Sequence, residues 1–266
     1  MPRFRITLEY DGTDFEGWQL QPAGRRTVQG CLAEVLERIC GQPVRVTGSG
    51  RTDSGVHAEG QVASVGIETR LGAAELQRAL NGNLPRDVAV VAVEVVPDDF
   101  DARRSATSKL YRYRIWNGGV RSPLRARYST WVPQRLDLDA MRRAAAPLVG
   151  EHDFASFQAA GSDASGGSRR RLLRVEVRGD PGGEVSIEVE GSGFLRHMVR
   201  NIAGTLIEVG RGRRSAEAIS EILAARDRSR AGPTAPPEGL ALLRVDYADR
   251  APDRSGSPPP PNGHSV

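Results

Sequence analysis

The sequence is poor in cysteine and has no long apolar runs. Its two cysteines, Cys31 and Cys40, are too few for a disulfide framework. No apolar run approaches the roughly 20 residues that a membrane-spanning helix needs. The opening residues lack the apolar core and the small-residue cleavage site of a secretory signal. These absences argue against a disulfide-stapled secreted domain and a membrane protein, and they predict a cytoplasmic location.

Lysine is almost absent as well, so the positive charge is carried by arginine. Lys109 is the only lysine among 37 lysine and arginine residues, and 33 acidic residues leave a net charge of +4. One interpretation is a compositional bias in which scattered surface cations serve solvation. The other is a polyanion partner, because the guanidinium group binds phosphate through two hydrogen bonds and stacks on bases. The clustering of arginines in the sequence supports the second interpretation. The clusters are Arg103–Arg104, Arg112 with Arg114, Arg169–Arg171 with Arg174, and Arg211 with Arg213 and Arg214.

Hydrophobic periodicity gives the first half of the chain the order strand, helix, strand, strand, helix, strand. Residues 3–10 alternate polar and apolar side chains, which is the period of a half-buried strand. After Thr27 the apolar positions step by three and four, and Gly41 follows as a stop signal for a helix. The expected elements are strands at 3–10, 43–48, 61–68 and 88–96, and helices between Thr27 and Gly41 and at 72–82.

The second half repeats this order with longer connections. A helix with an apolar face that runs from Leu195 to Val209 is closed by Gly210. A turn at Asp180–Gly183 joins two extended stretches into an expected hairpin. The expected elements are strands at 109–116, 171–178, 184–190 and 240–247, and helices at 137–149, 195–209 and 215–225.

Two such halves predict an α+β fold of two ferredoxin-like, split β-α-β units. Antiparallel sheets of this kind carry helices on one face and leave the other free for a nucleic acid or a partner sheet. We expect the halves at 1–104 and 105–248, with their sheets forming a central catalytic cleft. A disordered tail is expected at 249–266, which is rich in proline, glycine and serine, and a mobile loop at 161–168.

The most unusual segment is GSGRTDSGVHA at residues 48–58. Its glycines permit positive φ and a close approach of backbone to a ligand. It presents one carboxylate, Asp53, with Arg51 two residues before it and His57 four residues after it. Taken alone, the pattern leaves open a plain turn in which the carboxylate caps its own backbone.

Six ordered motifs give this segment a functional context. Residues 50–57, GRTDSGVH, closely resemble the signature of the TruA family of tRNA pseudouridine synthases, and the resemblance extends over about residues 3–248. Asp101 departs from the pattern, because some members are expected to have histidine there, and the arginines at 169–171 match no assigned role. The other five motifs are Tyr10–Gly12 with Phe15 and Gly17–Gln19, Phe100–Ala106 with Lys109–Tyr113, Asp153–Phe157, Phe194–Asn201, and Gly239–Leu242.

The resemblance implies a role for each matching position. Asp53 corresponds to the catalytic aspartate, and Arg200 to the arginine that pairs with it. Tyr111 corresponds to the tyrosine that stacks on the target base, and Leu240 to a leucine that packs the base from another side. Arg51 corresponds to a motif arginine expected to contact RNA.

The resemblance also implies an isomerase without a cofactor that acts on uridines 38 to 40 of the anticodon stem-loop of tRNA. It further implies a homodimer in which one tRNA contacts both subunits. Conversion of uridine to pseudouridine breaks the N1–C1′ bond, rotates the uracil and joins C5 to C1′, so one ionised carboxylate can suffice. The sequence leaves open whether that carboxylate adds to C6, captures C1′ or abstracts the 2′ proton. Which tRNAs are modified is also open.

Three other interpretations compete with this one. A non-catalytic RNA-binding protein on the same fold would have no reason to place Asp53 among arginines. A glycoside or nucleoside hydrolase needs a second acid, and the glycine-rich loop has none; Asp11 with Asp14 is a weak candidate pair. His57 and His197 lack the spacing of zinc ligands, so no metal site is expected.

Overall fold

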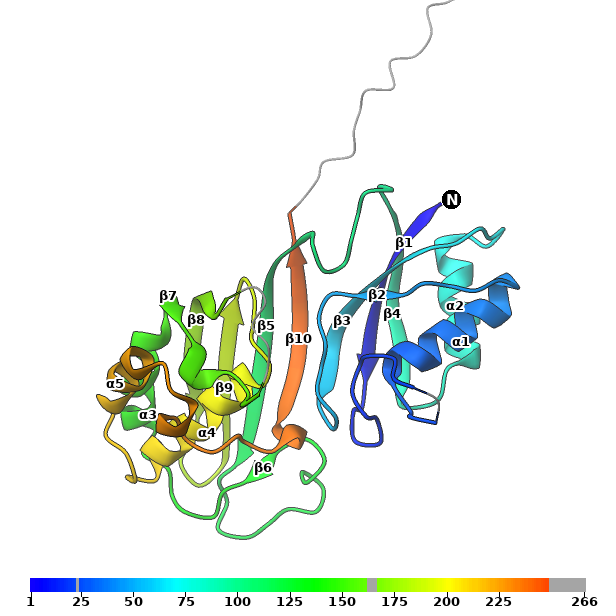
Figure 1. Cartoon of the computed structure of the whole chain (residues 1–266). Coiled ribbons are helices and arrows are strands. Elements are labelled where there is room, and N and C mark those ends of the chain that lie inside the picture. Colours follow the sequence, from blue (N-terminus) through cyan, green and yellow to red (C-terminus); the bar gives the residue numbers. More distant parts are fainter. Residues whose placement is uncertain (23, 162–166, 249–266) are drawn as a thin grey trace, which may run out of the picture.

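The strands join into one mostly antiparallel sheet, and the helices cover one of its faces (Figure 1). This computed structural model describes residues 1–22, 24–161 and 167–248. The expected tail at 249–266 and the central part of the expected loop, 162–166, lie outside the described residues. The strands are β1 (Arg3–Tyr10), β2 (Thr47–Gly48), β3 (His57–Gly66), β4 (Val88–Val96), β5 (Ala106–Trp116), β6 (Thr130–Trp131), β7 (Gly150–Asp153), β8 (Arg169–Gly179), β9 (Glu184–Gly191) and β10 (Leu240–Tyr247). The helices are α1 (Val28–Cys40), α2 (Ala73–Asn83), α3 (Leu138–Ala145), α4 (Met198–Gly210) and α5 (Ala218–Ala225).

Each half has the strand order of a split β-α-β unit. The first half pairs its strands as β4-β1-β3-β2, and the second half pairs them as β10-β5-β9-β8. Helices α1 and α2 belong to the first half, whereas α3, α4 and α5 belong to the second. The predicted α+β fold with ferredoxin-like halves is therefore confirmed.

The two halves share one sheet because β10 pairs with β3. This contact is parallel and short, with Ala241 opposite His57 and Leu242 opposite Ala58. On its other edge β10 pairs with β5 over most of its length. The last described strand therefore lies in the middle of the sheet and joins the halves edge to edge.

The strand expected at 43–48 is wrong in length, since only Thr47 and Gly48 pair with β3. Helix α1 supplies the reason. The Val44 N–H donates to Glu37 Oε1 at 3.1 Å, and Gln29 Nε2 donates to the Val46 carbonyl at 2.8 Å. Side chains of the helix thus satisfy backbone groups that a longer strand would have used in its ladder.

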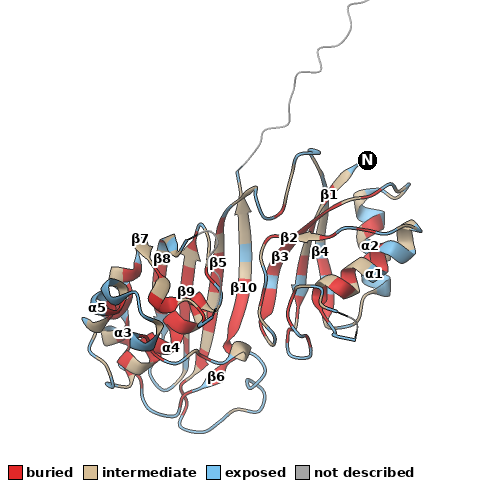
Figure 2. Cartoon of the chain, in the orientation of Figure 1, coloured by how far each residue is buried: buried red, intermediate tan, exposed pale blue. Residues whose placement is uncertain are grey.

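Helix α1 shows how local sequence fixes an element. The Thr27 hydroxyl accepts the Gly30 N–H at 3.2 Å at its start, and Gly41 ends it in the left-handed region at φ 67. Its apolar side packs on the sheet, and buried residues concentrate between the sheet and the helix layer (Figure 2). No helix within the described ranges has both the length and the apolar character to cross a bilayer.

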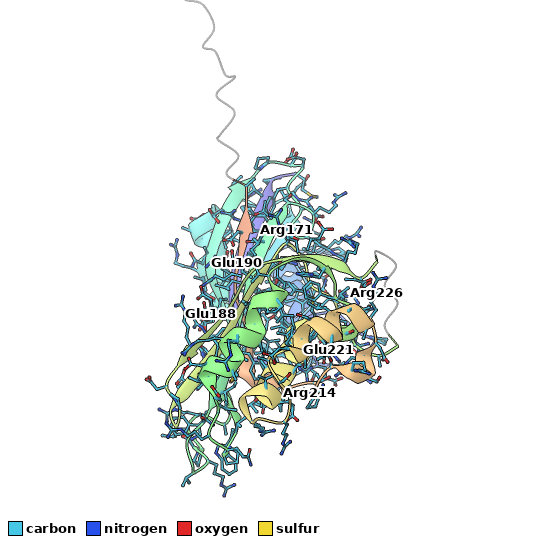
Figure 3. All side chains as sticks on the ribbon, turned by 90° about the vertical axis from the view of Figure 1, so that its left-hand side faces the viewer. Arg171, Glu188, Glu190, Arg214, Glu221 and Arg226 are labelled. Carbon is cyan, nitrogen blue, oxygen red and sulfur yellow. The ribbon has the colours of Figure 1, made fainter. Side chains whose placement is uncertain are left out.

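The opposite face of the second half carries charged side chains. Figure 3 shows Glu188 and Glu190 of β9 on one side of the sheet, and Glu221 and Arg226 with the helix layer on the other. Glu188 accepts from Arg112 of β5 at 2.9 Å, although its side chain is only 8% exposed. This face is thus covered by ion pairs rather than by helices.

Candidate active site

A cleft of about 1820 Å³ opens between the helices of the two halves. Its walls come from α1, from the loop between β2 and β3, from β5, from the segment before α4 and from the start of α4. All five residues that the sequence singled out for the site line this cleft, namely Arg51, Asp53, Tyr111, Arg200 and Leu240. Residues far apart in the chain are thus brought to one cavity by the edge-to-edge joining of the halves.

The loop that carries Asp53 is held on one side by the end of β1 and the segment that follows it. The Trp18 N–H donates to the Thr52 carbonyl at 3.1 Å, and the hydroxyls of Tyr10 and Thr52 are hydrogen-bonded at 2.8 Å. Gly17 makes this approach possible, because it has φ 91 and a Cβ there would lie 2.7 Å from the Thr52 oxygen. The backbone next to Asp53 is therefore clamped in place.

The same loop is also held by Gln61 of β3, whose side chain is fully buried. The Ser49 hydroxyl donates to Gln61 Oε1 at 2.6 Å, and Gln61 Nε2 donates to the Gly50 carbonyl at 3.0 Å. His57 helps at the end of the loop, where its Nδ1 accepts the Gly12 N–H at 3.0 Å. Satisfied buried polar networks of this kind rigidify a site.

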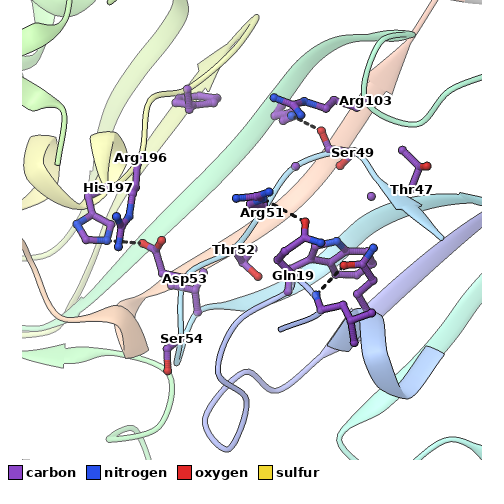
Figure 4. Close-up of a pocket in the computed structure, with 18 of the residues that line it drawn as sticks. Gln19, Thr47, Ser49, Arg51, Thr52, Asp53, Ser54, Arg103, Arg196 and His197 are labelled. Carbon is purple, nitrogen blue, oxygen red and sulfur yellow. Dashed lines mark hydrogen bonds and ion pairs between the residues drawn. The ribbon is translucent and has the colours of Figure 1, made fainter. Parts of the chain in front are cut away.

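Asp53 is paired with two side chains at the start of α4. Arg200 Nη1 lies 3.1 Å from Asp53 Oδ2, and Arg200 Nε donates to the Ala235 carbonyl at 2.8 Å, which fixes the guanidinium. His197 Nε2 lies 3.5 Å from the same carboxylate oxygen, and Figure 4 shows Asp53 turned towards His197. The expected pairing of Asp53 with Arg200 is present in the structure.

His197 is a partner of Asp53 that the sequence does not predict, because its spacing from His57 raises only the question of a metal ligand. It has φ 61, a left-handed conformation that is uncommon outside glycine and is often found at functional sites. Burial lowers its pKa from the ordinary 6.5, and the neighbouring Asp53 offsets part of that effect. The imidazole is therefore mostly neutral at pH 7. Helix α4 begins at Met198, three residues later than expected, because His197 breaks the helical conformation.

Tyr111 forms an aromatic wall of the cleft together with Phe194. Tyr111 is 8% exposed, and the two rings meet edge to face with centroids 5.0 Å apart. Burial raises the pKa of the Tyr111 hydroxyl, so it stays protonated. Leu240, at the start of β10, adds an apolar surface to the same cavity. Phe194 belongs to the Phe194–Asn201 motif, but no spacing in the sequence predicts that it lies beside Tyr111.

The charge of the cleft wall is strongly positive. Glu16 and Asp53 are the acids among the described residues that line it, and Arg51 donates to the neutral Gln19 oxygen at 3.1 Å. Outside the cleft, many arginines are paired with carboxylates, as Arg5 is with Glu94. The cations of the wall are Arg25, Arg45, Arg51, Arg103, Lys109, Arg170, Arg196 and Arg200.

We expect Gly17→Ala to displace the loop that carries Asp53. A methyl group at φ 91 would be strained and would press on the Thr52 oxygen, so the folded state should lose about 1–3 kcal/mol and kcat should fall. Gly24→Ala is the matched control, because Gly24 has φ 95 and the added carbon has no atom of the described residues within 4 Å, its chain neighbours aside. Thermal unfolding and kcat at a saturating concentration of the substrate measure both effects. Equal losses of stability in both variants, with kcat unchanged, would show that the contact does not hold the loop.

No group of three or more His, Cys, Asp or Glu side chains is placed to hold a metal ion in the part of the chain that the structure describes. The cleft instead presents one carboxylate between an arginine and a histidine, inside a wall of cations that fits a polyanion. The fold and the cleft together suit a protein that brings a carboxylate to a polyanion.

Comparisons with known proteins identify its family. The family model described as tRNA pseudouridine synthase matches residues 6–103 and 144–248. The tRNA pseudouridine synthase A of Myxococcus xanthus is 51% identical over 256 residues, covering 96% of each chain. That of Solidesulfovibrio magneticus is 48% identical over 263 residues, covering 97% of this chain and 95% of the relative. A solved chain in a Cbf5-Nop10-Gar1 complex is 12% identical with a TM-score of 0.36, and the match covers 90% of this chain and 57% of that one.

The chain belongs to the tRNA pseudouridine synthase family, as the motifs of the sequence predicted. It is therefore an isomerase that converts uridine in tRNA to pseudouridine.

Proposed function

We propose that Asp53 is the catalytic carboxylate and that it acts on uridines 38 to 40 of the anticodon stem-loop. The observation that carries the assignment is the contact of Asp53 with Arg200 at 3.1 Å inside a cationic cleft. The other acid of the cleft wall, Glu16, forms an ion pair with Arg25 at 2.5 Å. A hydrolase would need a second free acid there, so the geometry favours the isomerase.

Each neighbour has a part in the proposed reaction. Arg200 holds the carboxylate in its orientation while a substrate fills the cleft and excludes water. After the N1–C1′ bond breaks, the free uracil must be held by stacking, which the Tyr111 ring provides, while Leu240 packs against it from another side. Arg51 is assigned to the RNA backbone, because it lines the cleft and has a neutral partner.

Three first steps are compatible with this arrangement. The Asp53 carboxylate adds to C6 of the uracil, captures C1′ of the ribose as N1 leaves, or removes the 2′ proton to form a glycal. In each case the bond that finally forms joins C5 to C1′, and the C5 proton is lost. The isomerisation needs no net oxidant or reductant, since substrate and product have the same composition.

We further propose that the enzyme is a cytoplasmic homodimer and that one tRNA spans both subunits. The resemblance to the family supports both statements. A two-fold assembly would place two cationic clefts on one particle, which suits a substrate larger than either cleft.

The direct test is purified chain with tRNA transcripts. We expect pseudouridine at positions 38 to 40, detected by mass spectrometry after pseudouridine-specific derivatisation. The control is a transcript in which cytidine replaces those uridines, which should bind equally well and gain no modification. Pseudouridine elsewhere in the tRNA, with none at 38 to 40, would overturn the positional assignment.

A further inference from the structure

The single lysine of the chain lies against the loop that carries Asp53. Lys109 belongs to β5 and lines the cleft two positions before Tyr111. Its Nζ donates to the Ser49 carbonyl at 2.7 Å, and a Cβ on Gly50 would lie 2.9 Å from Nζ. The ammonium group is thus in direct contact with the backbone just before Arg51.

No carboxylate in the described part of the chain balances the charge of this ammonium group, and its hydrogen bond goes to a neutral carbonyl. Arg103, which also lines the cleft, adds positive charge nearby. Burial, with a smaller contribution from Arg103, lowers the pKa of Lys109 to about 8. Keeping such a cation buried is costly unless an anion completes the site.

Some cations elsewhere in the fold are balanced by carboxylates. On the helix-free face, Arg112 pairs with Glu188 at 2.9 Å, and Arg244 pairs with Glu190 at 3.2 Å. Among the described residues neither Lys109 nor Arg103 has such a partner, so both cations of this part of the cleft are open to a ligand that brings its own negative charge.

The identity of the residue is a second, independent observation. Every other cationic side chain of this protein is an arginine, so a lysine at 109 indicates a place where guanidinium is a poor substitute. An ammonium group is compact and can donate in three directions, whereas the guanidinium group is a wide planar fork. Because Nζ lies so close to Gly50, the space there suits the smaller ammonium group.

We propose that Lys109 and Arg103 form a subsite for one backbone phosphate of the substrate RNA, seated against Ser49 and Gly50. This inference rests on the proposed function and adds the part of the RNA that is recognised. One N–H of Lys109 keeps the Ser49 carbonyl, and the remaining N–H groups serve the phosphate. The bound phosphate is thus linked through one ammonium group to the loop that presents Asp53.

The first test is the salt dependence of RNA affinity. Lys109→Met should weaken binding of an anticodon stem-loop RNA about tenfold at low salt. It should also reduce the slope of log affinity against log salt by about 0.7–0.9, which is the share of one phosphate contact. Arg178→Met is the matched control, because Arg178 pairs with Glu176 and does not line the cleft. An unchanged slope in Lys109→Met would overturn the subsite, even if kcat falls, because loop positioning alone would then explain the loss.

The second test keeps Lys109 in place. Biosynthetic labelling with ¹³C,¹⁵N-lysine leaves all three N–H groups in place and gives one lysine side-chain signal in NMR, because the chain has one lysine. In Asp53→Asn, which is used to hold RNA unreacted, the pKa reported by this signal should start near 8 and rise by about one unit or more on RNA binding. A pKa unmoved by saturating RNA would overturn the proposal.

The two proposals fail in different ways. If the purified chain makes no pseudouridine at positions 38 to 40 but the lysine signal and the salt slope respond as expected, the assignment of the reaction site is wrong and the phosphate subsite stands. If pseudouridine forms and neither readout responds, the phosphate subsite is wrong and the proposed function stands.

Discussion

Asp53→Asn is expected to abolish pseudouridine formation while leaving tRNA affinity nearly unchanged. The amide has the shape of the carboxylate, and its oxygen can still accept from Arg200, which now lies 3.1 Å from Asp53 Oδ2. It cannot act as a nucleophile or a base, so turnover should fall at least a thousandfold, or about 4 kcal/mol in the barrier. Asp53→Glu should also fail, because the longer side chain moves the carboxylate away from its partners.

The matched control is Asp87→Asn. Asp87 also binds an arginine, with Arg26 donating to both of its oxygens at 2.8 Å, and it does not line the cleft. This variant should keep normal turnover at saturating tRNA. If Asp53→Asn still forms pseudouridine at more than about a thousandth of the normal rate, Asp53 is not the catalytic carboxylate.

Tyr111→Leu is expected to cause the second large loss, whereas Tyr111→Phe should retain binding and the early steps. A flipped base loses its stacking in the RNA, and an aromatic face in the pocket offsets about 1–3 kcal/mol of that cost. Phenylalanine keeps the face and the edge contact with Phe194. Because burial raises the pKa of the Tyr111 hydroxyl, it is poorly suited to act as an ionised base in the free enzyme.

Single-turnover rates separate stacking from proton transfer. Tyr111→Phe that binds tRNA normally but stalls before product would give the hydroxyl a role in removing the C5 proton. Equal, severe loss of binding in both variants would make Tyr111 a structural strand residue. Tyr113→Phe is the control on the same strand. The Tyr113 hydroxyl is hydrogen-bonded to the Thr130 hydroxyl and to the Pro236 carbonyl, so its loss should lower stability alone.

The elements that local pattern determines were predictable from the sequence. Residues 240–247 form β10 with the expected bounds, and β1 follows the alternation of residues 3–10. In β1 alternate side chains are buried against the core, so the side-chain period identifies the strand, whereas in β10 the apolar first three residues are all buried. Helix α1 was equally predictable, since Thr27 caps its first turn and Gly41 ends its last turn.

Features that depend on distant partners were not predictable in this way. The short length of β2 follows from hydrogen bonds to Glu37 and Gln29, which belong to another element. The contact of His197 with Asp53 and that of Lys109 with Ser49 each join the two halves. No periodicity within a segment carries that information, whereas the family motifs located Asp53 and Arg200 because their spacing reflects the complete site.

The central position of β10 has a consequence for how the enzyme folds during its synthesis on the ribosome. The first half can form most of its own ladder early, but the edge of β3 at His57 and Ala58 stays open until Ala241 and Leu242 have been synthesised. An unpaired edge is a site for association with other chains, and synthesis proceeds at about 5–20 residues per second. The nascent protein therefore carries its aspartate loop for about 10–40 seconds before the last strand closes the sheet. A chain truncated before residue 240 would lack both that closure and Leu240 in the wall of the cleft.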